Sequence, residues 1–196
     1  MNFRICKLDG DEAEFERCED AYRQHLKRFE EDTRTHLWKF FGWDFFHDGS
    51  IESLEVRGDL KTVVMRLSCP NIKRLKANGD HEYVNVMFEC TFHTVSTFAV
   101  QYETPEHSWD VRKNATQFLD AEINTSPILD SFGPEDELNP DPHHSLLIRL
   151  EADYSIIWLE LIFSEVDVMA DEPAAFALME SDPKFEVPTW LGDTTP

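Results

Sequence analysis

Apolar residues occupy every second position along residues 84–92, with Met87 the one apolar residue between them, and this pattern constrains the fold more than any other. Its apolar members are Val84, Val86, Phe88, Cys90 and Phe92. Successive side chains of a strand point to opposite faces, so a period of two predicts a strand with one buried face. Similar runs occupy residues 51–56, 60–67, 98–102, 119–123, 146–150 and 157–163. With turns at 58–59 and 153–154 and a bulge or turn near 93–96, we expect six or seven antiparallel strands joined mainly as hairpins.

The N-terminal part has a helical period instead. Asp9 followed by Glu12 is typical of a helix start, and Gly42 of a helix end. Between them, apolar residues recur at steps of three and four from Phe15 to Phe40, opposite a charged face. We therefore expect an α+β fold, in which one long N-terminal amphipathic helix packs on the sheet. We expect residues 1–170 to form a single domain and residues 171–196 an acidic, proline-rich tail.

The charge is strongly skewed toward the C-terminal half. The net charge is −21, and residues 105–196 hold 20 Asp and Glu against four Lys and Arg. This field disfavours nucleic acid as a partner, and the one basic cluster (Lys73, Arg74, Lys76) is small. The skew serves solubility, or it presents a negative surface to a basic protein partner. On the second reading, the partner-binding residues are Asp130, Glu135, Asp136, Glu137, Asp141, Glu160, Glu165 and Asp167.

Other classes of protein leave signals that this sequence lacks. It has no apolar segment long enough to cross a bilayer and no secretory signal, so we expect a cytoplasmic protein without membrane contact. Its four cysteines form no C-x-x-C pair, so we expect reduced thiols and no zinc ribbon. Nucleotide-binding and serine-hydrolase motifs are missing too. We expect no catalytic residue, metal or cofactor.

Two acidic motifs deserve an alternative interpretation. The dipeptide His47-Asp48 resembles the paired metal ligands of metal phosphohydrolases, but Asp48-Gly49 also forms a turn into the next strand, with His47 packed beside Phe45 and Phe46. Asp120 and Glu122 share a strand face, as a glycosidase pair would, or they lie on an ordinary solvated face. We favour the structural interpretation in both cases.

Residues 40–168 resemble a family of small, mostly uncharacterised bacterial domains. The family has Trp or Phe before a His-Asp dipeptide and then a strand with spaced Ile residues, here Trp43 to Leu54 with His47-Asp48. It closes with an apolar-Phe-x-x-Val-x-Val segment, here residues 161–168, and has an acidic residue like Glu122 in an earlier strand. Leu54 stands where the pattern has Ile, and the acidic loop at 126–144 is an insertion. Some relatives resemble immunity proteins of toxin systems, and the family implies no catalytic residues.

Together these observations predict a non-enzymatic cytosolic binding protein, of the immunity type, that masks a basic partner through its acidic C-terminal half. Two alternatives stay open. One is a hydrolase or metal-dependent enzyme that uses His47 and Asp48. The other is a homo-oligomeric structural domain.

Overall fold

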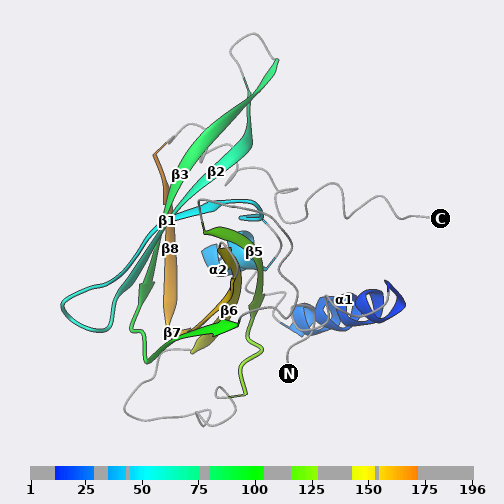
Figure 1. Cartoon of the computed structure of the whole chain (residues 1–196), viewed down its shortest axis with the longest axis vertical. Coiled ribbons are helices and arrows are strands. Elements are labelled where there is room, and N and C mark those ends of the chain that lie inside the picture. The colour runs from blue at the N-terminus through cyan, green and yellow to red at the C-terminus, as the bar shows by residue number, and fades with distance from the viewer. Residues whose placement is uncertain are drawn as a thin grey trace.

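The computed structural model describes residues 12–28, 35–42, 45–75, 80–103, 116–127, 143–152 and 155–171. The described strands form one antiparallel sheet of eight strands in the order β4-β7-β6-β5-β1-β2-β3-β8 (Figure 1). The strands are β1 Ser50–Val56, β2 Val63–Leu75, β3 His81–His93, β4 Thr97–Glu103, β5 Gln117–Ile123, β6 His144–Ala152, β7 Ser155–Phe163 and β8 Glu165–Ala170. The predicted strands and both hairpins, β1–β2 and β6–β7, are confirmed, and β8 is an additional strand.

The prediction of a long N-terminal helix on the sheet is wrong, and so is the α+β class built on it. The described residues are mostly β, with two short helices, α1 Glu12–Leu26 and α2 His36–Phe41. Thr35 starts α2 in an extended conformation (φ −75°, ψ 153°), and its side chain accepts a hydrogen bond from the Trp38 amide. An extended N-cap residue cannot lie inside a continuous α-helix, so the apolar stripe passes through two separate helices.

The sheet divides into two half-sheets because β1 and β5 share only the pair Ser50↔Gln117. The first half-sheet is β1-β2-β3-β8 and the second is β4-β7-β6-β5. At the opposite side, β3 continues into β4 while β7 continues into β8, so the same two chain segments pair in both halves. His93 pairs with Glu165 and Thr97 with Ile162, which leaves one extra residue on the β3–β4 side. This bulge, where Thr94 has a φ of 51°, bends the ribbon from one half-sheet into the other.

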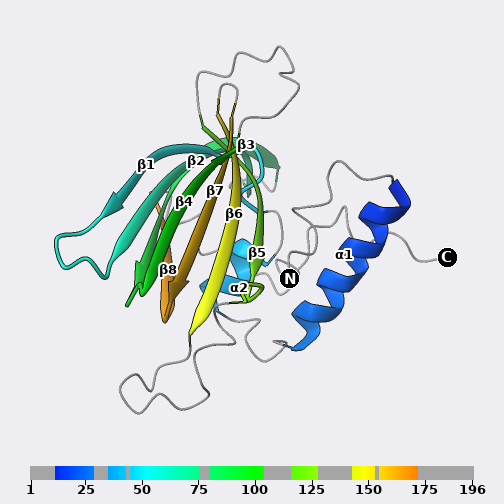
Figure 2. The same cartoon turned by 60° about the horizontal axis from the view of Figure 1, so that its bottom comes forward.

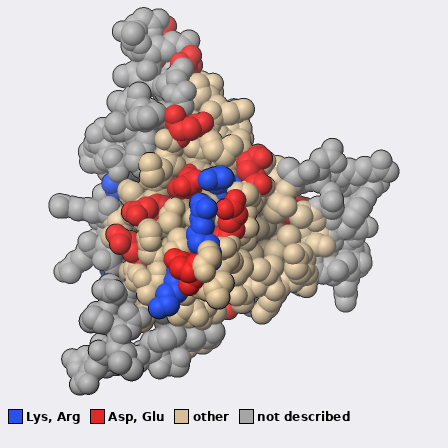
Figure 3. Space-filling view, turned by 90° about the vertical axis from the view of Figure 1, so that its left-hand side faces the viewer, with Lys and Arg blue, Asp and Glu red and all other residues tan. Residues whose placement is uncertain are grey.

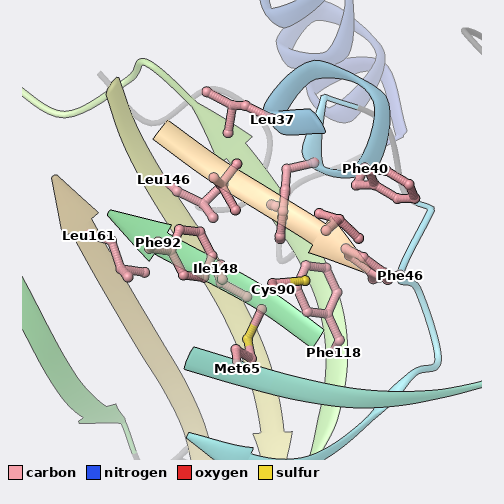
Figure 4. Close-up of a cluster of buried hydrophobic side chains, with 14 of the residues drawn as sticks. Leu37, Phe40, Phe46, Met65, Cys90, Phe92, Phe118, Leu146, Ile148 and Leu161 are labelled. Atoms are coloured by element: carbon pink, nitrogen blue, oxygen red, sulfur yellow. The ribbon is translucent and has the colours of Figure 1, made fainter. Parts of the chain in front are cut away.

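The core lies between the half-sheets and is filled by aromatic rings. Helix α2 lies against β5 and β8 on the inner side of the curved sheet (Figure 2). It brings Phe41 within 5.8 Å of Phe92, ring centre to ring centre. Phe46, in the turn after α2, lies 5.4 Å from Phe88 of the first half-sheet and 5.8 Å from Phe118 of the second. Phe46 and Phe118 are labelled in Figure 4. These contacts join the two half-sheets through one aromatic cluster.

Helix α1 lies beside the β5 side of the sheet in both views (Figures 1 and 2). Tyr22 is fully buried, and its hydroxyl oxygen accepts a hydrogen bond of 3.0 Å from the Ile123 amide. His25 Nε2 donates to the Ile123 carbonyl over 3.2 Å. The helix therefore closes an edge of β5 instead of covering a sheet face. Neither described helix has the length and apolar content needed to cross a bilayer.

Candidate interaction surface

The outer face of the first half-sheet concentrates charged side chains. Alternation directs Met65, Cys90 and Val168 into the core, so their neighbours along each strand point outward. The outward set contains five carboxylates and two guanidinium groups: Glu55, Glu89, Glu165, Asp167 and Asp171, with Arg57 and Arg66. We call these seven residues the acidic face. Figure 3 views the molecule from the side of β8 in Figure 1 and shows acidic groups on both sides of a row of basic ones.

Both arginines of the acidic face are already paired. Arg66 Nε lies 2.8 Å from Glu89 Oε2, and its Nη1 lies 4.0 Å from Glu55 Oε1. Arg57 Nη1 lies 3.5 Å from Glu55 Oε2. The hydrogen bond to Glu89 raises the pKa of Arg66. Solvent screens exposed pairs of this kind and they add little to stability, so these charges matter more for what approaches the face.

The excess negative charge lies along β8 and its end. Glu165 and Asp167 are exposed on alternate positions, and Asp171 follows on the same side. Asp167 Oδ2 lies 3.1 Å from His93 Nε2, and Asp171 Oδ1 accepts a hydrogen bond of 2.9 Å from the Met87 amide. Between the two aspartates, Met169 is 67% exposed. The strand thus presents a flexible apolar side chain between carboxylates.

The structure brings only part of the predicted partner-binding set together. Glu165 and Asp167 lie on the acidic face, whereas Glu160 lies in β7 on the outer face of the other half-sheet. Glu160 is half-buried, and its Oε1 accepts a hydrogen bond of 2.5 Å from Ser126 Oγ. The remaining five predicted residues lie outside the described residues: Asp130, Glu135, Asp136, Glu137 and Asp141.

Sequence reasoning missed Glu55 and Glu89, which belong to the nearly balanced first half of the chain. Their signal was present in the alternation, since Glu89 stands between the buried Phe88 and Cys90 and Glu55 stands between two apolar residues of a predicted strand. What the sequence did not show is that β8 pairs with β3, which sets Glu89 beside Met169 and Thr91 beside Asp167. The long-range pairing, and not the local composition, assembles this face.

The His47-Asp48 dipeptide forms a turn, as expected. Asp48 has a φ of 63°, a conformation that Asp adopts more readily than most residues, and its amide donates to the Phe118 carbonyl over 2.9 Å. The prediction that His47 is a packed ring is wrong, because its side chain is 50% exposed. Its Nδ1 donates to the Leu119 carbonyl over 2.6 Å. This leaves Nε2 facing Asp48 Oδ1 at 3.7 Å.

A residue with a side chain could not easily follow this turn. A Cβ at Gly49 would meet the Phe46 carbonyl oxygen at 2.9 Å and Cys69 Sγ at 3.0 Å. The turn therefore brings the backbone at the start of β1 into close contact with β5, through hydrogen bonds between Asp48, Gly49 and Phe118. Among the described residues, no group of three or more His, Cys, Asp or Glu side chains is arranged to hold a metal ion.

Glu122 contradicts the interpretation of residues 120 and 122 as a solvated face. Its side chain is fully buried, and it lies close enough to His25 to influence that ring electrostatically. Burial lowers the pKa of His25, an effect that the hydrogen bond to Ile123 and the charge of Glu122 partly oppose. The buried Glu122 and the half-buried His25 both lie at the junction between α1 and β5.

The cysteines in the described residues are free thiols: Cys18, Cys69 and Cys90. Burial raises the pKa of Cys69 to about 12 and that of Cys90 well above its usual value. Both thiols therefore stay protonated and unreactive at neutral pH.

In comparisons with known proteins, no family model matches the chain, and no curated protein matches it significantly. The resemblance to small bacterial domains therefore stays a prediction.

Proposed function

We propose that this chain is a non-enzymatic, cytoplasmic binding protein that masks a basic protein partner through its acidic face, as an immunity protein does. One observation carries the proposal. Glu165 and Asp167 of β8, and Asp171 directly after it, lie in a row on a face whose two arginines are already held by Glu55 and Glu89. No arginine of the acidic face neutralises these three carboxylates; Asp167 contacts His93 and Asp171 accepts from the Met87 amide through one oxygen each, which leaves their second oxygens and Glu165 for cations from outside.

The composition of this row suits a protein partner. Complementary charges raise the association rate and disfavour wrong partners, while an apolar side chain at the centre of an interface adds binding energy when it is buried. Met169 has the exposure and flexibility to fill a shallow pocket of a partner. Lysine and arginine side chains of that partner would meet the flanking carboxylates.

The test uses a panel of purified basic nuclease toxin domains, measured for binding and for inhibition of nuclease activity. We expect at least one domain to bind, to be inhibited, and to bind more weakly at ~500 mM than at ~50 mM salt. The double charge reversal Glu165→Lys/Asp167→Lys should weaken binding by at least about tenfold.

The matched control is Glu16→Lys/Asp20→Lys, which makes the same change in net charge on exposed positions of α1. We expect this variant to bind within about threefold of the wild type, because charges beyond one Debye length act weakly. Equal losses in both variants would show that only the overall charge matters, and would contradict the proposal. So would the failure of every basic domain to bind.

A further inference from the structure

In the described part of the chain, side chains block the edge strand β8 and the side of β5 that lies beyond its single pair with β1. On β8, the Val168 amide donates to His36 Nδ1 over 2.8 Å, and α2 lies against that strand. On β5, Tyr22 and His25 bond to Ile123, and His47 bonds to Leu119. Each bond occupies a backbone group that would otherwise be open to a further strand.

The remaining edge strand, β4, is treated differently. It is the last strand of the sheet and pairs with β7 on one side. Among the described residues, no strand or side chain bonds to its other side. Natural edge strands are usually protected by charges, proline or bulges, but residues 97–102 of β4 contain neither a charged residue nor proline. Val100 and Tyr102 are 40% and 74% exposed.

We propose that β4 is the interface of a homodimer, in which it pairs antiparallel with β4 of a second copy of the chain. The distribution of charge favours a second copy of the chain as the partner at this edge. Two copies of a chain with a net charge of −21 repel each other, so they can meet closely only where carboxylates are few. Residues 94–102 form an uncharged stretch that ends at Glu103. A basic partner would gain nothing from this edge and much from the acidic face.

The strand is also complementary to itself. Phe98, Val100 and Tyr102 stand on one face, opposite Leu161, Leu159 and Ile157 of β7. A two-fold axis through Val100 sets Phe98 opposite Tyr102 of the partner subunit, and the reverse pair follows by symmetry. Aromatic cross-strand pairs of this kind stabilise antiparallel strands. Such an isologous contact joins two sheets across β4 and leaves β8 accessible.

Light scattering and analytical ultracentrifugation of the full chain at ~1–100 µM test the proposal. We expect a mass near twice the 22.9 kDa of one chain. The variant Val100→Lys/Tyr102→Lys should be a monomer. The control Leu60→Lys/Tyr83→Lys changes two similarly exposed apolar residues (76% and 69%) away from β4 and should stay a dimer. Added lysines lower the net negative charge, so general repulsion cannot explain a monomeric variant.

A monomeric wild type overturns the proposal, as does a dimer that survives the β4 substitutions or that the control also abolishes. If the β4 variant fails to fold, hydrogen exchange of the wild type decides. Protection of the amides at 97–103 that rises with protein concentration supports the dimer. Protection that is independent of concentration shows that the edge is open or is covered within one chain, and overturns it.

Discussion

The substitution Tyr22→Phe tests how α1 completes the sheet, because it removes one hydroxyl group and no other atom. Tyr22 is fully buried, Ile123 is 1% exposed, and the amide of Ile123 donates to this hydroxyl over 3.0 Å. In the variant that amide has lost its acceptor in a buried position. Leaving a buried donor unsatisfied costs about 1–3 kcal/mol. For a protein of this size, that corresponds to a fall in melting temperature on the order of 5 °C.

Circular dichroism melts and urea denaturation measure this loss. The control is Tyr83→Phe, which makes the same chemical change at a side chain that is 69% exposed, and it should stay within about 0.5 kcal/mol of the wild type. Hydrogen exchange at the Ile123 amide should accelerate in Tyr22→Phe alone. Equal stability of the two variants would refute the role of Tyr22 as the cap of the β5 edge.

Three other predictions follow from single groups. Burial lowers the pKa of His25 below its ordinary 6.5, so the unfolded chain binds a proton at this residue at higher pH than the folded protein does. The stability that is present above pH 6.5 is therefore lost as the pH falls toward the folded-state pKa. The variant His25→Gln should show a smaller decline of the urea midpoint over this pH range. Cys69 and Cys90 should resist iodoacetamide in native protein and react after unfolding, as peptide mass spectrometry would show; labelling of either in the native state would contradict their burial. His47→Ala should lower the free energy of unfolding by about 0.5–1.5 kcal/mol, since it removes the bond to Leu119, and an unchanged urea midpoint would argue against that role.

The strands could be predicted from the sequence because burial repeats at every second residue. Residues 84–92 are apolar at every second position, with Met87 as the single departure between them, and the structure buries Val86, Phe88, Cys90 and Phe92. The same logic located both hairpins, whose turns lie close in the sequence. It failed at β8, where Val166 and Val168 are the only buried residues of a short strand.

The helix prediction failed because the spacing of apolar residues does not reveal where a helix is interrupted. Apolar residues keep their spacing from Tyr22 to Phe40, yet Thr35 is an extended N-cap residue between two helices. The capping side chain competes with the backbone for a hydrogen bond, and this local choice is invisible to periodicity. The available signal was Thr35 itself, because Thr is one of the residue types preferred at a helix N-cap.

The candidate surface could be predicted only in part for a similar reason. Charge counting located Glu165 and Asp167, but it grouped them with Glu160, which the corner between β7 and β8 places on the other half-sheet. Pairing between β3 and β8 spans more than 70 residues of sequence and adds Glu89 and Glu55 to the same face. Neither fact follows from composition.

The central claim is that the negative charge of this protein forms a directed binding surface. Its most direct test is a titration of isotope-labelled protein with a short Lys- and Arg-rich peptide, followed by NMR chemical shifts at ~50 mM salt. We predict that the amide shifts concentrate on β8, its end and the neighbouring strand β3, at Glu165, Asp167, Asp171 and Glu89. Shifts spread evenly over the exposed carboxylates, with Glu16 and Asp20 of α1 moving as much as Asp167, would contradict the claim and leave the charge as a solubility trait.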